Sequence, residues 1–231
     1  MKKALYLLLL MALLTGCASQ NGVDEAGTDN RDTTLETSIT TELSSNPEDE
    51  LSPSLQAYIA VLENKTPLYN SYSKKEMYLD ETVVISEGER IEKFSIIDLN
   101  DDGSPEVVLR LYYMTNEDYA FSVLHYEDGI VYQYGFPYRG FNDLKVDGSF
   151  YWSNSAFNSG IAKLDFHKDE YIETNLAYCD VDTEENYSYY IGDKSVSHAE
   201  FSAFQDEHGK TQSVEWHDYS IEDFKSSVAN S

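Results

Sequence analysis

The sequence has few basic residues. Its 231 residues include 16 Lys and Arg against 42 Asp and Glu, which gives a formal net charge of −26 at pH 7. Nucleic acids and anionic lipid headgroups bind through cationic side chains, so we exclude nucleic acid as a partner. Two interpretations of the charge stay open. It attracts cations or basic partners, or it only keeps the protein soluble.

Long apolar runs are also scarce, and the one that stands out covers residues 4–14. A run of this length spans about half of a ~30 Å hydrocarbon core, which argues against a transmembrane helix. Lys2 and Lys3 precede the run, and the small residues Thr15 and Gly16 follow it. This arrangement is typical of a secretory signal peptide. We therefore expect residues 1–16 to be removed.

Cysteine is the third scarcity, since the chain has only Cys17 and Cys179. The sequence Leu14-Thr15-Gly16-Cys17 resembles a bacterial lipobox, which implies that Cys17 carries a diacylglyceryl group and further acyl chains such as palmitate. Each buried methylene adds about 0.8 kcal/mol to anchoring. The resemblance thus implies a lipid anchor in the cell membrane, with the protein on its extracytoplasmic face. Cys179 then lacks an intramolecular disulfide partner, and we expect a buried, inert thiol.

Composition divides the rest of the chain into a tether and one domain. Residues 17–51 begin with the lipidated Cys17 and are rich in Ser, Thr, Asp and Glu, which predicts a disordered acidic tether. Its reach is about 30 Å. Ser52 and Pro53 suit the start of a helix. We expect a single β-rich globular domain over 52–231.

The elements expected in this domain make its fold class α+β, mainly an antiparallel β meander. Seven runs rich in Val, Ile, Tyr and Phe predict strands. They cover residues 92–99, 106–113, 120–126, 130–134, 149–153, 161–166 and 171–178. Short turns such as Asp128-Gly129 favour antiparallel pairing.

Helices are expected at both ends of the domain. Apolar residues at helical spacing predict an N-terminal helix over 53–63. Ser197 and Glu200 form a capping box, which predicts a short C-terminal helix over 198–207. A strand over 214–219 and a last short helix over 221–228 complete the chain.

One segment has the composition of a cation site. Asp98, Asn100 and Asp102 alternate just before a glycine that permits a sharp turn. Their side-chain oxygens, with the Ser104 carbonyl and the Glu106 carboxylate, suit the shell of about 6–8 oxygens that Ca²⁺ prefers. Magnesium fits less well, because it demands octahedral geometry. The alternative is a polar hairpin turn without a metal.

This segment resembles the D-x-D-x-D-G-x-x-D/E loop of FG-GAP and VCBS-type β repeats, with Asn100 replacing one Asp and Glu106 in the last position. It departs from an EF-hand, since Pro105 and Leu109 occupy positions where that loop needs other residues. The resemblance implies a weak structural calcium site, with affinity of about 10⁻⁴–10⁻³ M. With its lipobox and acidic tether, the chain also resembles a group of uncharacterised surface lipoproteins of Gram-positive bacteria. That resemblance implies location and architecture only.

The sequence contains no catalytic pattern. Its five histidines show no H-E-x-x-H or H-x-H spacing, and it has no G-x-S-x-G elbow. We therefore expect a surface binding or structural module rather than an enzyme. The alternative is a secreted-side hydrolase with an acidic site that the sequence does not identify.

Aromatic residues are abundant, with 19 Tyr, 10 Phe and 2 Trp. Exposed rings on a sheet could stack on sugars or peptides, so the expected partner is an extracellular protein or glycan. The alternative is that these rings pack in the core. The candidates for stacking are Tyr112, Tyr113, Tyr132, Tyr134, Tyr138, Tyr151 and Trp152.

Overall fold

The computed structural model describes residues 51–83, 90–113, 119–155, 158–182, 184 and 186–229. All of them belong to the second of two compact units, residues 44–231. The predicted signal peptide, Cys17 and the tether up to residue 50 lie outside the described residues. Within the described part, no helix combines the length and the apolar character that crossing a membrane requires.

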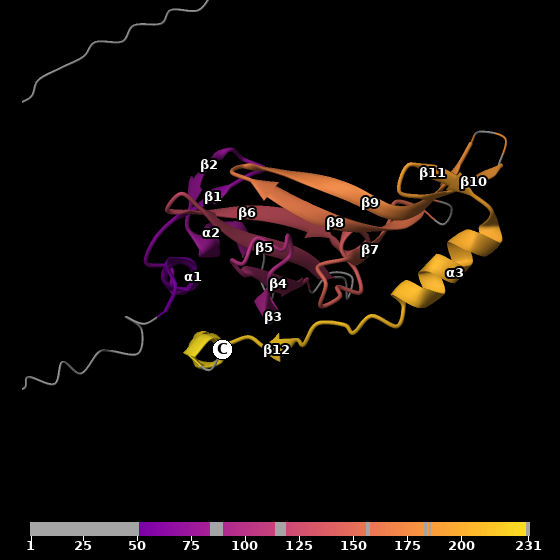
Figure 1. Cartoon of the computed structure of the whole chain (residues 1–231). Coiled ribbons are helices and arrows are strands. Elements are labelled where there is room, and N and C mark those ends of the chain that lie inside the picture. Colours follow the sequence, from indigo (N-terminus) through magenta and orange to yellow (C-terminus); the bar gives the residue numbers. More distant parts are fainter. Residues whose placement is uncertain are drawn as a thin grey trace, which may run out of the picture. The chain divides into compact units, whose positions relative to one another are not determined.

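Two β-sheets form most of the described unit (Figure 1). The strands of the first sheet are β1 (Leu68–Asn70), β2 (Lys75–Met77), β3 (Arg90–Ile97), β4 (Glu106–Tyr112), β5 (Tyr119–Glu127), β6 (Ile130–Pro137) and β12 (His217–Asp218). Their order is β12-β3-β4-β5-β6-β1-β2. The strands of the second sheet are β7 (Phe150–Ser153), β8 (Ser159–His167), β9 (Glu170–Val181), β10 (Tyr187–Ile191) and β11 (Lys194–Val196). Their order is β11-β10-β9-β8-β7.

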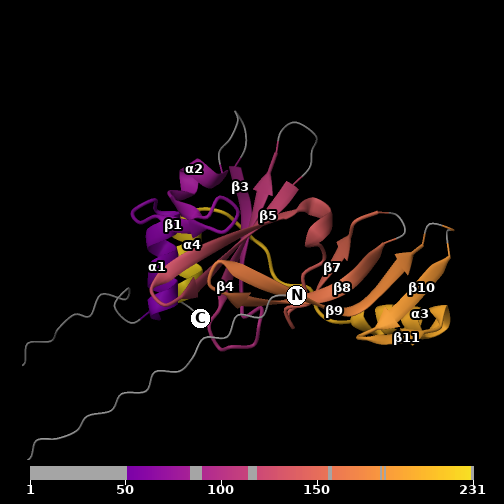
Figure 2. The same cartoon turned by 90° about the horizontal axis from the view of Figure 1, so that it is seen from above.

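Four α-helices among the described residues flank the sheets. They are α1 (Pro53–Leu62), α2 (Leu79–Val83), α3 (His198–His208) and α4 (Ile221–Ala229). Ser52 caps α1, because its hydroxyl accepts a hydrogen bond from the Leu55 N–H at 3.3 Å. Figure 2 shows α1 beside α4 against the first sheet, and α3 beside β10 and β11 of the second.

The predicted α+β class is confirmed, with an N-terminal helix, two C-terminal helices and mainly antiparallel sheets. One strand pair is parallel: β1, which the sequence did not predict, pairs with β6 through Tyr69↔Tyr132 and Asn70↔Gln133. The strand expected over 214–219 is reduced to β12, which pairs with β3 through two residues only. The strand expected to reach Leu99 ends at Ile97.

The seven-stranded sheet is covered on both faces. Along β4, Val107 and Leu109 pack against the helices, while Val108 between them packs toward the second sheet. Val107 and Leu109 share a hydrophobic cluster with Tyr58 of α1 and Phe224 of α4, so these helices cover this face of the sheet. The alternation of the pleat therefore supplies both cores from one set of strands.

Candidate functional site

The predicted calcium loop forms the turn between β3 and β4, and most of its predicted ligands lie together there. The Asp98 carboxylate accepts hydrogen bonds from the backbone N–H groups of Asp102 at 3.1 Å and Gly103 at 2.8 Å. The Asp102 carboxylate accepts from the Ser104 N–H at 2.7 Å and from the Asn100 amide at 3.0 Å. Such bonds stabilise a polar turn by themselves. The described residues contain no group of three or more His, Cys, Asp or Glu placed to hold a metal, and calcium binding stays a prediction.

The last predicted ligand, Glu106, points into the protein interior. Its side chain is 0% exposed, and its Oε2 accepts a hydrogen bond from the Leu99 N–H at 2.8 Å. Its Oε1 lies 2.9 Å from Nδ1 of His125, whose ring stacks on Phe166. Burial raises the pKa of the Glu106 carboxyl, and the hydrogen bonds from His125 and Leu99 act in the opposite direction. The period of the strand indicated this orientation, because Glu106 shares a face of β4 with the buried Val108.

A serine, a histidine and an aspartate also meet, at a point that resembles a hydrolytic site. The Ser149 Oγ lies 2.5 Å from Oδ1 of Asp147 and 2.7 Å from Nε2 of His208. In a catalytic triad the histidine stands between the acid and the serine, so that it takes the hydroxyl proton. Here the serine stands between the other two and is fully buried. The cluster fastens the turn before β7 to the end of α3.

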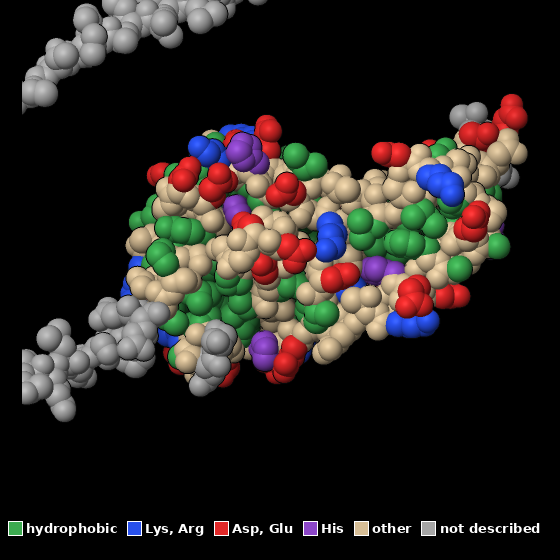
Figure 3. Space-filling view, in the orientation of Figure 1, with side chains coloured by type: hydrophobic (Ala, Val, Ile, Leu, Met, Phe, Trp, Pro, Cys, Tyr) green, Lys and Arg blue, Asp and Glu red, His purple; other side chains and the backbone are tan. Residues whose placement is uncertain are grey.

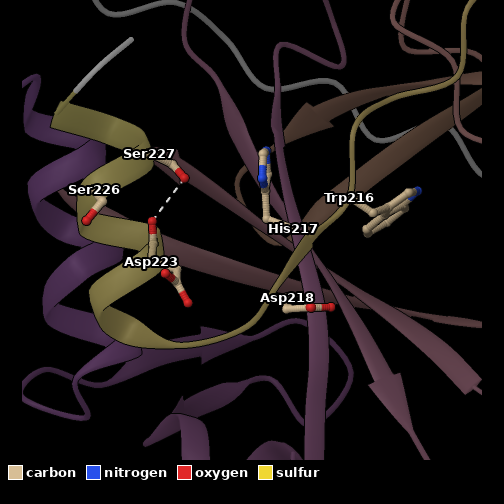
Figure 4. Close-up of a pocket in the computed structure, with 6 residues that line it drawn as sticks. All are labelled: Trp216, His217, Asp218, Asp223, Ser226 and Ser227. Carbon is tan, nitrogen blue, oxygen red and sulfur yellow. Dashed lines mark hydrogen bonds between the residues drawn. The ribbon is translucent and has the colours of Figure 1, made fainter.

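A cavity of about 530 Å³ lies between β12 and α4 (Figure 4). It is lined by Trp216, His217, Asp218, Asp223, Ser226 and Ser227. The Ser227 hydroxyl donates to the Asp223 carbonyl of its own helix at 2.9 Å, and Asp218 pairs with Lys93 at 2.6 Å. The His217 ring packs on Phe94. These contacts secure the C-terminal helix, and they do not arrange a base beside the Ser227 hydroxyl.

Two further cavities share Tyr72 and Gly135, and together we call them the Gly135 groove. The first cavity, about 400 Å³, is lined by Ser71, Tyr72, Tyr134, Gly135, Asp169, Glu170 and Tyr171. The second cavity, about 270 Å³, has Leu111, Ser122 and Gln133 among its lining residues. The Tyr72 side chain is 97% exposed. The groove therefore combines the solvent-exposed ring of Tyr72 with a strand position, Gly135, that has no side chain.

The second cavity has a polar floor with fixed orientation. The Gln133 carboxamide oxygen accepts a hydrogen bond from the Asn70 amide at 2.9 Å. The Gln133 amide nitrogen donates to the hydroxyls of Thr82 and Ser122, each at 3.0 Å. Gln133 is buried, so this network joins β1, β5, β6 and α2 under the cavity. These hydrogen bonds fix the orientation of the Gln133 carboxamide.

The first cavity has aromatic and acidic walls. The Tyr134 hydroxyl donates to the Lys168 carbonyl in the turn between β8 and β9, and its ring lies 5.7 Å from that of Tyr171. Burial raises the pKa of both tyrosines, so their hydroxyls stay protonated at neutral pH. Asp169 pairs with Lys74 at 2.7 Å, and this hydrogen bond lowers the pKa of the Asp169 carboxyl.

The aromatic residues that the sequence offered as candidates for stacking differ in their exposure. Tyr132, Tyr134 and Trp152 are buried, while Tyr138 is exposed. The other three candidates, Tyr112, Tyr113 and Tyr151, are partly buried. Tyr113 and Tyr134 line the groove, but its most exposed ring, Tyr72, was not among the candidates. Tyr72 lies in the turn between β1 and β2, where the sequence has no alternating strand pattern from which its exposure could be predicted.

The surface is acidic, as the composition predicts. Figure 3 shows acidic side chains spread over the face in view and fewer basic ones between them. Cys179, expected to be buried, is partly exposed on β9, with its Sγ 3.6 Å from the Ser159 Oγ.

In comparisons with protein-family models, curated proteins and solved structures, the chain has no significant match.

Proposed function

We propose that this chain is a lipid-anchored extracytoplasmic binding protein that holds its ligand in the Gly135 groove. The lipobox at residues 14–17 supports the anchor, and the acidic tether that follows supports a domain displayed away from the membrane. The fixed amide network and the aromatic walls support the ligand site. Catalysis is not part of the proposal.

The exposure of Tyr72 is the observation that carries the proposal. A tyrosine that buries its ring removes about 150–250 Å² of surface from water. Tyr72 leaves almost all of its surface in water, beside the amide floor of the groove. An exposed ring next to oriented hydrogen-bonding groups is typical of sites that take a ligand by stacking and hydrogen bonding.

The anchor is tested with the full chain in a bacterial host that processes lipoproteins. We expect wild type to incorporate a labelled fatty acid and to sediment with membranes. Cys17→Ser should lose both, while Cys179→Ser, the matched control at the other cysteine, should keep both. A wild-type chain that incorporates no fatty acid would overturn the anchor.

The groove is tested with the full chain purified from membranes in detergent. Two probes are used, an array of bacterial cell-wall glycans and a displayed library of random nonapeptides. Ligands from either probe should bind Tyr72→Ala about tenfold more weakly, which corresponds to about 1.4 kcal/mol. Tyr78→Ala serves as control, because Tyr78 is 43% exposed and lies outside both cavities. Equal binding to wild type and Tyr72→Ala would overturn the site.

A further inference from the structure

The strand β6 has an open edge at the Gly135 groove. Its Gln133 carbonyl accepts a hydrogen bond from the Ser71 N–H at 3.0 Å, so the backbone polar groups of Gln133 face β1. The N–H and C=O groups of a strand turn to the same edge at every second residue. Gly135 therefore presents its N–H and C=O to the side on which β1 lies.

The strand β1 ends before it reaches Gly135. After Asn70 the chain turns away, because the Lys74 N–H donates to the Asn70 carbonyl at 2.8 Å and the Ser73 N–H to its side chain. Within the described residues, no hydrogen bond from outside β5 and β6 reaches the Gly135 backbone. An edge of this kind is a template for another strand.

Within the described part of the chain, no close contact requires a glycine at position 135. Glycine in a strand interior costs about 0.5–1 kcal/mol relative to alanine. At Gly160 the reason is clear, because a Cβ would lie 2.6 Å from the Ala177 carbonyl. At Gly135 a Cβ would meet nothing within 4 Å, and the backbone is not in the left-handed region. The missing side chain instead leaves open the space on that face of the strand, where a side chain of an added strand would fit.

The two cavities lie where the side chains of an added strand would go. Gly135 lines both cavities, Gln133 lines the second cavity, and Tyr134, which packs toward the second sheet, lines the first. Successive side chains of a strand point to opposite faces of its sheet. A strand beside Gly135 would therefore place alternate side chains in the two cavities.

The charge of the first cavity selects among peptides. Asp169 and Glu170 both line it; Lys74 forms an ion pair with Asp169, and Glu170 also interacts electrostatically with Lys74, so two carboxylates face one ammonium group. The ring of Tyr171, which is 41% exposed, can attract a cation. The chain as a whole carries −26 charges, which favours encounter with basic partners.

We infer that the Gly135 groove binds an extended basic peptide, which pairs with the edge of β6 and places a Lys or Arg side chain beside Tyr171 and Glu170. This inference rests on the proposed function, since it identifies the ligand of the same groove. Main-chain hydrogen bonds to Gly135 give the peptide its affinity, and the first cavity gives it specificity.

The test selects random displayed nonapeptides on the full chain in detergent and measures the selected peptides by fluorescence anisotropy. Selected sequences should carry Lys or Arg. N-methylation of alternate backbone amides should weaken binding at least tenfold, since it removes donors to the sheet edge. Gly135→Val should also weaken binding, because its side chain fills the space that a peptide side chain would occupy, while the melting temperature stays equal or rises. Glu170→Gln should weaken binding about threefold to tenfold and reduce its salt dependence.

Ile130→Val is the matched control, because Ile130 is an exposed position at the other end of β6. It should bind as wild type does. Peptides that tolerate N-methylation or bind Gly135→Val equally would overturn the inference. Glycans that bind through Tyr72, with no peptide selected, would overturn the inference and leave the proposed function standing. No ligand from either probe would overturn both.

Discussion

The seven-stranded sheet and the outer part of the five-stranded sheet differ in how they are stabilised. In β4, nearly every side chain is buried, alternately against the helices and against the second sheet. We call β10, β11 and α3 the outer region. Its strands are exposed or half-buried, and α3 buries only Phe201. The seven-stranded sheet is thus stabilised mainly by tertiary packing, and the outer region mainly by local hydrogen bonds.

This difference predicts that the two parts open separately. Local opening requires less free energy where few apolar contacts are lost. In the outer region the buried Phe201 ring of α3 packs on the Tyr189 ring of β10, with the ring centroids 5.2 Å apart. The covered sheet should therefore exchange its amide hydrogens only on global unfolding, and the outer region well before that.

The largest effect is expected at Phe94, in the covered sheet. Its ring is 0% exposed and lies 5.3 Å from Phe224 and 5.2 Å from His217. Phe94→Ala should lower the free energy of unfolding by about 3–5 kcal/mol, measured by denaturant titration. Ile172→Ala, at a position 61% exposed, should change it by less than about 0.5 kcal/mol. Similar losses in the two variants would contradict the comparison.

A smaller and more local effect is expected at Phe201. Phe201→Ala should lower the free energy of opening of the outer region by about 1.5–3 kcal/mol, because it removes that region's main buried side chain. Hydrogen exchange by mass spectrometry should show faster exchange over 187–208 and unchanged exchange over 106–112. If both segments accelerate equally, the two parts form one cooperative unit.

The sequence was sufficient to predict the elements that are determined by residues close together in the chain. The 106–113 strand followed from its apolar run, and α3 followed from the capping box, in which Ser197 and Glu200 exchange hydrogen bonds. The strands β1, β2, β10 and β11 were not predicted. They have three to five residues and little burial, and their neighbours in the sheet determine them.

The candidate site was less predictable for the same reason. The aromatic count indicated a binding surface, but strand propensity does not distinguish the buried Tyr132 from an exposed ring. The groove depends on where β1 ends, and on a glycine whose surroundings are set by segments far apart in the sequence. At Glu106 the sequence suggested a site residue that the fold uses otherwise. Its spacing matches a calcium loop, but its position in β4 directs the side chain into the interior, where it contacts Leu99 and His125.

The pKa of a carboxyl group is raised in the covered sheet, at Glu106, and lowered in the outer region, at Glu200. This difference gives a prediction of pH dependence. Burial raises the pKa of Glu106, so the folded state retains its proton to higher pH than the unfolded state does. Its contribution to stability should therefore fall as pH rises above about 4.5, the ordinary value of a glutamate. Glu106→Gln keeps the shape and removes this dependence, by at most about 1.4 kcal/mol per pH unit.

The measurement is the free energy of unfolding of both proteins between pH 4 and pH 8. The difference between Glu106→Gln and wild type should grow in favour of the variant as pH rises. Glu76→Gln, at an exposed position of β2, is the control and should leave the curve unchanged. A parallel pair of curves for Glu106→Gln and wild type would show that this carboxyl titrates as it does in the unfolded chain.

The smallest effect is expected at the cap of α3. The Ser197 hydroxyl accepts from the Glu200 N–H at 3.3 Å, and the Ser197 N–H donates to the Glu200 carboxylate at 2.8 Å. Ser197→Ala should lower the free energy of opening of α3 by about 1 kcal/mol. The hydrogen bonds that the Ser197 N–H and the Ser197 hydroxyl donate to the Glu200 carboxylate lower the pKa of Glu200, so its contribution is present at neutral pH and is lost as pH falls through its folded value. Exchange over 198–208 should therefore accelerate in acid beyond its intrinsic rate, which is the reverse of the trend at Glu106. Ser202→Ala, inside the same helix, should leave that acid dependence in place, whereas Ser197→Ala should reduce it.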